Sequence, residues 1–387
     1  MPPPRPCLAP CFPRCPNVCQ SSGIRLAFVP PATCRCGGKA VYDGSLGGAM
    51  DASGELVLGV DIGGTKTAYG YVDLSGKCLA AGVMATDSKF PVAHFFRRLH
   101  DHAAALLTGL GEGWTLAGIG LGAPEVNSFT GTIEHPANLK WDFVNLVEEM
   151  GRYYPLPIAA TNDANAVAIG ELLFGAAKGM RDFVAITLGT GVGSGLVVNG
   201  ELVYGADGMA GELGHLPVTG RSGRECGCGQ LGCLETYASA SGIVRTAVEL
   251  MATRRAPSPL RAIPFDQLTA KALCEQASQG DALALEAFEV TGRILGEKLA
   301  DLVLITRPEA FILFGGLAGA GELIFKPTQR AMEENLPHAF KGKVALLPSG
   351  VAGTDAAILG AGALIWNELR KRGNALVSPV PARVKND

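Results

Sequence analysis

One histidine and three cysteines lie close together in a glycine-rich stretch that begins with Glu212 and ends with Glu235. A histidine with three closely spaced cysteines is a ligand set for tetrahedral Zn²⁺, which binds neutral imidazole and thiolate. Four protein ligands leave no open coordination position, so zinc bound here would have a structural role. A disulfide, or cysteines clustered by chance, are the alternatives at this spacing. The four candidate ligands are His215, Cys226, Cys228 and Cys233.

The two glutamates that flank this loop are harder to explain as scaffolding. A metal ion that fixes the loop would aim the carboxylates of Glu212 and Glu235 at one place. We therefore interpret the loop as a metal-stabilised floor beneath a polar ligand.

A glycine turn that begins at Asp61 has the features of a phosphate-binding loop. It joins an apolar run at residues 56–60, typical of a buried strand, to a second predicted strand at residues 68–73. It does not lead into a helix, as a Walker loop would, but its amides and hydroxyl can hold phosphate oxygens. Asp61 can hold Mg²⁺ directly or through water; an ordinary β-hairpin turn is the alternative. The candidate residues are Asp61, Gly63, Gly64, Thr65 and Lys66.

A second glycine turn follows the predicted strand at residues 183–188 and repeats this architecture. Further strand residues at 196–198 and 202–204 lie around an Asn199-Gly200 hairpin turn. Two matching turns indicate two similarly built domains that face each other, each offering one loop to a triphosphate. The candidate residues of the second turn are Gly189, Thr190 and Gly191.

Asp163 follows a short predicted strand, residues 157–161, and begins a predicted helix over residues 162–172. Asn162 or Asp163 would cap this helix, and capping alone is one interpretation of Asp163. The other is a general base, because a carboxylate at a helix N-terminus is stabilised in its ionised form. An ionised aspartate near a hydroxyl can take its proton as the oxygen attacks phosphorus. Asn138, in a polar loop, offers a hydroxylated ligand both a donor and an acceptor.

The chain has 387 residues, enough for two domains and a sizeable core. Its formal net charge of −3 provides no electrostatic footprint for nucleic acid or an anionic membrane. No apolar run approaches the ~20 residues of a transmembrane helix. We therefore expect neither a nucleic-acid partner nor a membrane partner.

Residues 1–50 differ in composition from the rest of the chain. They contain six of the eleven cysteines, and seven prolines among the first 16 residues forbid a regular helix. They also lack the unbroken apolar stretch of a secretory signal. We expect a disordered extension, or one foreign to the native protein, with Met50 as the natural start.

Together these motifs resemble those of the ROK family (repressor, open reading frame, kinase) in the actin-like sugar-kinase superfamily. The resemblance extends from about residue 55 to about residue 369. It implies an α/β, two-domain actin-like ATPase fold (sugar kinase/RNase H-like) with an interdomain cleft and a zinc-stapled loop. The implied domains are 51–161 completed by helix 355–372, and 162–354 with the zinc loop, followed by a loose tail at 373–387.

The resemblance also implies roles for individual residues. Asp163 would be the catalytic base, and ATP, Mg²⁺ and structural Zn²⁺ would be the cofactors. Gly315 and Gly316, after a predicted strand, would lie beside the adenosine, although a strand-to-helix turn also explains this pair. The sugar-binding residues would be Asn138, Asn162, Asp163, Glu212, His215 and Glu235.

The implied activity is ATP-dependent phosphorylation of a small-molecule hexose, with glucose and its 6-hydroxyl as the first expectation. N-acetylmannosamine, N-acetylglucosamine, fructose and allose are alternatives, because residues 122–125 depart from the Gly-Pro-Gly-type turn that borders the hexose in many members. A sugar-responsive repressor would need a helix-turn-helix module, which the proline-rich residues 1–50 cannot form. A sugar-binding module with an inactive kinase core is the remaining alternative. The family also leads us to expect a cytoplasmic homodimer.

Overall fold

A computed structural model describes residues 54–134, 136, 139–218, 222–351 and 355–374. All of these residues belong to one compact unit, Met50–Asp387. The predictions made for residues 1–50, for Asn138 and for the tail from residue 375 lie outside the described residues. Residues 373 and 374, which we expected to be loose, are the last two residues of a helix.

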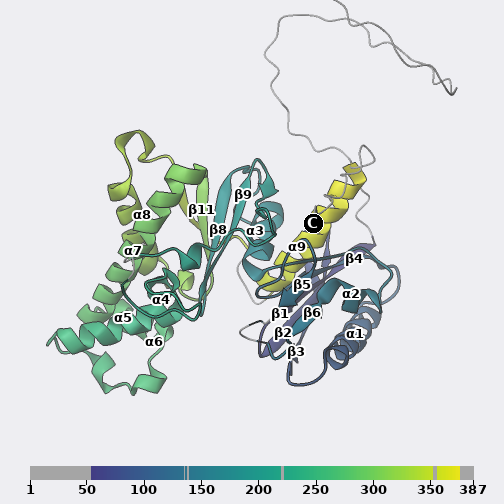
Figure 1. The fold of residues 1–387 in the computed structure, drawn as a ribbon, viewed down its shortest axis with the longest axis horizontal. Helices are drawn as coiled ribbons and strands as arrows, with labels where there is room; N and C mark the ends of the chain where they lie inside the picture. The colour runs from purple at the N-terminus through teal and green to yellow at the C-terminus, as the bar shows by residue number, and fades with distance from the viewer. Residues whose placement is uncertain (1–53, 135, 137–138, 219–221, 352–354, 375–387) are drawn as a thin grey trace, which may run out of the picture. The chain divides into compact units, whose positions relative to one another are not determined.

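The first of two five-stranded sheets consists of β1 (Glu55–Ile62), β2 (Lys66–Asp73), β3 (Cys78–Ala85), β4 (Thr115–Gly122) and β7 (Ile158–Thr161). Their order is β3-β2-β1-β4-β7, and Figure 1 labels β3, β2, β1 and β4 of this sheet. The central strand β1 pairs antiparallel with β2 and parallel with β4. The β1–β2 hairpin is the predicted strand, glycine turn and strand, whereas β3 has no counterpart among the predicted elements.

The second sheet consists of β8 (Phe183–Leu188), β9 (Val192–Val198), β10 (Glu201–Leu202), β11 (Ala310–Phe314) and β12 (Ala345–Pro348). Its order is β10-β9-β8-β11-β12, and β8 pairs antiparallel with β9 and parallel with β11. Both sheets therefore attach parallel strands to one side of an antiparallel hairpin, which confirms the repeated architecture predicted from the glycine turns. The division into lobes at residues 51–161 and 162–354 stays a prediction.

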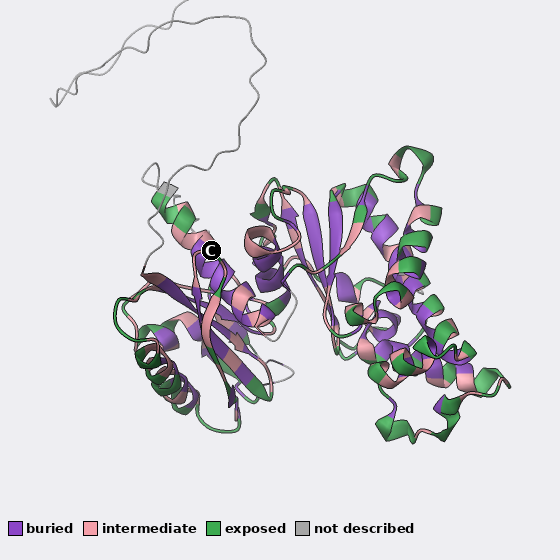
Figure 2. Cartoon of the chain, turned by 180° about the vertical axis from the view of Figure 1, so that it is seen from behind, coloured by how far each residue is buried: buried purple, intermediate pink, exposed green. Residues whose placement is uncertain are grey.

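Alternating side chains of the central strands face two different layers, as expected for strands that are buried on both faces. In β1, Leu58 packs in a cluster with helix α1 (Val92–Gly109), whereas Val57 packs with helix α9 (Ala356–Asn374). Figure 2 shows the central strands as largely buried. This double burial explains why β1 appears in the sequence as an apolar run without polar alternation.

Strand β8 repeats this alternation in the second sheet. Ile186 belongs to a cluster with helices α5 (Ala240–Thr253) and α7 (Ala282–Thr306), whereas Ala185 packs with helix α3 (Asp163–Phe174). The strand ends that carry Asp61 and Gly189 therefore emerge from equivalent positions of two similarly covered sheets.

Helix α9 packs closely against both the first sheet and α3 (Figure 1). A Cβ atom on Gly59 of β1 would overlap the carbonyl oxygen of Ile358, and one on Gly360 would press on the backbone of Ala166. Glycine at these positions allows the backbones to approach each other. The C-terminal helix is thus part of the core of the described structure.

The remaining helices are α2 (Leu146–Gly151), α4 (Glu235–Ala238), α6 (Ala270–Ser278) and α8 (Glu322–Asn335), and β5 (Thr132–Glu134) pairs with β6 (Phe143–Asn145). Short 3₁₀ turns cover Leu213–His215, Pro259–Ala262, Phe265–Gln267, Ala318–Ala320 and His338–Phe340. Within the described ranges, no helix has the length and apolar character needed to cross a membrane.

Candidate active site

One cavity of about 460 Å³ gathers most of the predicted site residues. Its volume is typical of pockets that bind small molecules. The cavity is lined by residues at the ends of strands from both sheets and by residues near the cysteine loop. The predicted residues that line it are Asp61, Asn162, Asp163, Gly189, Thr190, Gly191, Glu212, His215, Glu235 and Gly315.

The first glycine turn contributes only Asp61 to this lining. The Gly63 N–H donates to the Lys66 carbonyl at 3.0 Å, and the Thr86 N–H donates to the Thr65 carbonyl at 2.9 Å. The turn is thereby closed on itself and tied to the segment after β3. The predicted residues that do not line the cavity are Gly63, Gly64, Thr65, Lys66, Gly316, Cys226, Cys228 and Cys233.

Two hydroxyl residues beside the second glycine turn also line the cavity, although the sequence analysis did not select them. Thr187 Oγ1 accepts a hydrogen bond from the Gly193 N–H at 3.1 Å, and Ser194 Oγ donates to the Gly211 carbonyl at 2.5 Å. The only feature of the sequence that could have identified these two residues as part of the site is their position next to the glycine turn. These two hydrogen bonds fix the conformation of the second glycine turn, whose residues line the cavity.

Asp163 is the first residue of α3, and the preceding Asn162 is the capping residue. Asn162 Oδ1 accepts from the Asn165 N–H at 2.7 Å, the usual N-cap bond. Asp163 Oδ1 accepts from its neighbour, the Ala164 N–H, at 2.8 Å. Since Asn162 caps the helix, capping alone does not explain an acidic residue at position 163.

Burial dominates the electrostatics of the two aspartates. It raises the pKa of Asp163 above its ordinary value, although hydrogen bonds from the backbone at Ala164 and at Asp163 itself act in the opposite direction. Burial, together with the negative charge of Asp163, raises the pKa of Asp61 to about 6. The backbone at the helix N-terminus does stabilise the ionised carboxylate of Asp163, but in the free protein desolvation outweighs this effect.

The charges of the cavity fit a divalent cation. Asp61 and Asp163 are two partly desolvated carboxylates close enough to repel each other, and no lysine or arginine is among the described lining residues. Carboxylate oxygens are the ligand type that Mg²⁺ prefers. A cation at Asp61 would relieve the repulsion between these two carboxylates and compensate their burial.

Glu212, His215 and Glu235 lie on the side of the cavity next to the cysteines. Glu235 is the first residue of α4, and its Oε2 accepts from the Val192 N–H at 3.1 Å. Burial raises the pKa of Glu212, opposed by nearby His215. The His215 Nε2 lies 3.9 Å from Glu212 Oε2. These three side chains form a polar surface suited to the hydroxyls of a ligand.

The histidine and the three cysteines converge with the spacing of a tetrahedral metal site. Cys228 Sγ lies 3.7 Å from Cys233 Sγ, and Cys226 Sγ lies 3.8 Å from His215 Nδ1. Ligands of a tetrahedral zinc with bonds of about 2.3 Å lie about 3.8 Å apart. All four ligand atoms lie within 4.8 Å of one another, and the three cysteines are free thiols rather than disulfides. The donor set therefore fits Zn²⁺.

Glu125, in the segment that departs from the family turn, also lines the cavity. Its backbone φ is 59°, in the left-handed region that glycine adopts at little cost. Its negative charge also raises the pKa of Glu212. This backbone geometry favours glycine at position 125, where this chain has a carboxylate instead.

Replacing Glu125 with glycine is expected to raise the free energy of unfolding by about 0.5–1 kcal/mol. The substitution removes the steric strain of a left-handed side-chain-bearing residue, partly offset by the greater freedom of glycine in the unfolded chain. Equilibrium urea unfolding would measure the change. Asn199→Gly is the matched control, because Asn199 has φ 55° but is a residue type that tolerates this conformation. An equal gain in both variants would contradict the explanation.

Comparison with known proteins adds independent findings. The protein-family model for the ROK family matches residues 57–368. The chain is similar to a glucokinase of Halalkalibacterium halodurans, with 36% identity over 314 residues that cover 80% of this chain and 94% of the relative. It is 27% identical over 224 residues to the DNA-binding transcriptional dual regulator NagC of Escherichia coli, covering 58% of this chain and 54% of NagC.

Among solved structures, the chain resembles a ROK family glucokinase from Streptomyces griseus, determined in complex with glucose and AMPPNP. The TM-score is 0.67 and the sequence identity 34%, over 80% of this chain and 98% of that one. The residues matched by the family model, 57–368, include the second glycine turn and the cysteine loop.

Proposed function

Since this chain belongs to the ROK family, we propose that it is an ATP-dependent hexose kinase that converts glucose to glucose 6-phosphate. The Halalkalibacterium glucokinase is matched over 94% of its length, whereas the NagC regulator is matched over only 54%. This difference favours the kinase over the sugar-responsive repressor that the same family contains.

The observation that carries the proposal is the position of Asp163 in the shared cavity. The second glycine turn, Gly189 to Gly191, lines the same space as the hydroxyl-binding side chains of Glu212 and Glu235. A phosphate donor at the turn and a sugar at the glutamates would both reach Asp163. This arrangement suits the transfer of a phosphoryl group to a sugar hydroxyl.

In the proposed mechanism, ionised Asp163 accepts the proton of the glucose 6-hydroxyl as that oxygen bonds to the γ-phosphorus. The bond from phosphorus to the bridging oxygen breaks, and ADP leaves with the electron pair. Backbone N–H groups of the second glycine turn would stabilise the charge that spreads over the transferring group. Gly315 would lie on the adenosine side, with the first glycine turn supporting Asp61.

Two metal ions complete the proposal. Asp61 would hold Mg²⁺, directly or through water, and bound Mg²⁺ supplies positive charge to the phosphates. His215 Nδ1 and the thiolates of Cys226, Cys228 and Cys233 would hold structural Zn²⁺. His215 Nε2, which lies toward Glu212, would then be available to the sugar.

A coupled assay of ADP release over a panel of hexoses tests the proposal. We expect the highest kcat/KM with glucose, and lower values with N-acetylmannosamine, N-acetylglucosamine, fructose and allose. A higher kcat/KM for one of the others would change the substrate within the kinase class. Absence of ADP release with every sugar would reject the kinase.

Catalysis should depend on pH at values well above the ordinary aspartate range. Because the pKa of Asp61 is about 6 and that of Asp163 is also raised, kcat/KM for glucose should fall about tenfold per unit below pH 6. Initial rates at limiting glucose and subsaturating Mg²⁺, between about pH 5 and about pH 8, measure this, because bound Mg²⁺ would itself lower the pKa of Asp61. An acid limb near pH 4 would contradict the assignment.

The effect of Asp61 on stability has the opposite direction. The folded protein binds this proton more tightly than the unfolded chain, since folding raises the pKa from 3.8 to about 6. Its contribution to the free energy of unfolding is therefore fully present below pH 3.8 and is lost as the pH rises to about 6. Asp61→Asn should remove this part of the pH dependence from metal-free protein.

Two further properties are proposed from the family alone. A homodimer would be detected by analytical ultracentrifugation as a species of twice the 40.0 kDa chain mass. A cytoplasmic location would be tested by fractionation of the native host.

A further inference from the structure

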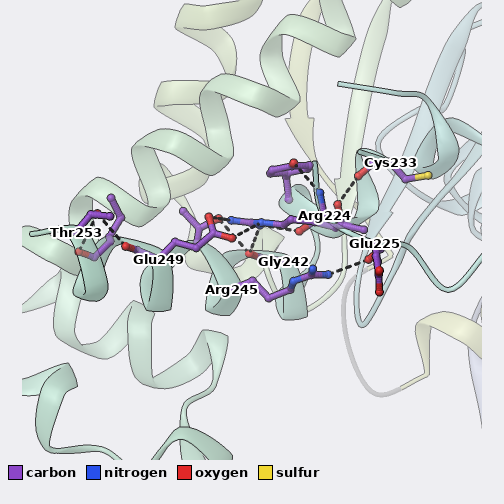
Figure 3. A network of polar contacts seen from close by, with 11 residues as sticks. Arg224, Glu225, Cys233, Gly242, Arg245, Glu249 and Thr253 are labelled. Atoms are coloured by element: carbon purple, nitrogen blue, oxygen red, sulfur yellow. Dashed lines mark hydrogen bonds and ion pairs between the residues drawn. The ribbon is translucent and has the colours of Figure 1, made fainter. Parts of the chain in front are cut away.

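Arg224 is a buried arginine, with a side chain only 7% exposed, whose guanidinium makes five hydrogen bonds (Figure 3). It makes two bonds to Glu249, from Nε at 2.9 Å and from Nη2 at 2.7 Å. A guanidinium has five N–H donors, so its hydrogen-bonding capacity is fully used. The other bonds go to the carbonyls of Thr236 at 2.7 Å and Gly242 at 3.0 Å and to Thr246 Oγ1 at 2.9 Å.

The backbone of Arg224 is held as firmly as its side chain. Its carbonyl accepts from the Gly232 N–H at 2.8 Å, which closes the cysteine loop just before Cys233. Its N–H donates to the Tyr237 hydroxyl at 3.2 Å, and its guanidinium carbon lies 4.3 Å from the centre of the Tyr237 ring. Arg224 therefore ties the cysteine loop to both α4 and α5.

The hydrogen-bond network of Arg224 reaches the residue next to Glu235, one of the proposed sugar-binding residues of the candidate active site. Thr236, whose carbonyl Arg224 binds, directly follows Glu235, the first residue of the four-residue helix α4. So short a helix has little rigidity of its own, because nearly all its carbonyls lack an intrahelical partner. The position of the Glu235 carboxylate in the cavity thus depends on what holds Thr236.

Stability alone does not explain the network. Glu249 is 60% exposed in its side chain, so the attraction within the ion pair is screened by water. A buried ion pair is often no more stable than well-packed apolar residues of similar volume. What the planar guanidinium supplies, and an apolar side chain does not, is five bonds in a fixed geometry.

We propose that Arg224 is a positioning residue for the hexose site and for the metal loop. Arg224 holds α4 and the cysteine loop in place against α5. It thereby determines the position of the Glu235 carboxylate that would bind the sugar and of the cysteine thiolates that would bind the metal. The proposal rests on the proposed hexose kinase function, and it assigns Arg224 no contact with either substrate.

Kinetics of Arg224→Lys in the full-length enzyme test this role. Lysine keeps the charge but loses the planar fork, so we expect KM for glucose to rise about tenfold, as for a lost supporting contact. kcat and the KM for ATP should change by less than about twofold. Zinc release to a colorimetric chelator should become about tenfold faster. Glu249→Gln, which alters an exposed partner and leaves three guanidinium bonds, should shift the same quantities by a smaller factor.

Arg293→Lys is the matched control, because Arg293 is an exposed arginine whose ion pair with Glu297 lies within α7 and involves neither the cysteine loop nor α4. It should leave KM and zinc release unchanged. A lower melting temperature in Arg224→Lys and Glu249→Gln, with wild-type glucose KM and wild-type zinc release, would overturn the proposal. A wild-type protein that phosphorylates no hexose would reject the function, while the zinc-release comparison would still decide the role of Arg224.

Discussion

Replacing Asp163 with asparagine is expected to lower kcat for glucose phosphorylation by about 10³-fold, the scale of a lost general base. Asparagine cannot accept the proton of the 6-hydroxyl, but it has nearly the same shape and can still hydrogen-bond to sugar. The dissociation constant for glucose, measured by isothermal titration calorimetry, should therefore stay within about threefold of wild type. Retained turnover would remove the base assignment.

The stability of this variant separates a catalytic defect from a folding defect. Desolvation raises the pKa of Asp163, so ionising this carboxylate costs more free energy in the folded protein than in the unfolded chain. A neutral amide, whose oxygen can still accept from the Ala164 N–H, should melt at the same temperature or higher. Asp266→Asn, at an exposed site, is the control for loss of one negative charge. A destabilised Asp163→Asn would contradict this account of the site.

The parts of the site that could be predicted are those in which residue type determines chemistry. Cysteine, histidine and carboxylate side chains have few other reasons to cluster, and the cysteine loop does bring His215, Cys226 and Cys233 together. The strands could be predicted for a similar reason, since burial on both faces produced apolar runs such as β1 and β8. The edge strand β3 has only partial burial and small residues, so no such pattern marked it.

The supporting residues could not be predicted because their role depends on contacts between distant segments. Arg224 resembles any surface arginine until its partners on α4 and α5 are known. The left-handed conformation of Glu125 is likewise a property of the folded turn. The net direction of the Asp163 pKa could not be predicted for the same reason, because a helix N-terminus is visible in sequence but desolvation is not.

Replacing Cys228 with serine is expected to abolish stoichiometric zinc binding and weaken glucose binding. Loss of a supporting contact lowers metal affinity by about 10–100-fold, so loss of a direct ligand should exceed about 100-fold. Because Cys228 is exposed, the substitution removes little packing, and its consequences can be attributed to the metal. With the loop no longer held by four ligands, Glu235 and His215 lose their fixed positions, and KM for glucose should rise more than about tenfold. Elemental analysis and glucose kinetics measure both effects.

Cys274→Ser is the control that distinguishes the effect of losing the metal from the effect of losing any one thiol group. Cys274 is a free, half-buried cysteine on α6, outside the four-residue cluster. Its replacement should leave one zinc per chain and wild-type glucose kinetics, even if packing costs some stability. An active, zinc-free Cys228→Ser enzyme with wild-type KM would show that the loop positions Glu235 without a metal. If the wild-type protein held no zinc either, the convergent thiols would need another explanation, while the assignment of Asp163 would be untouched.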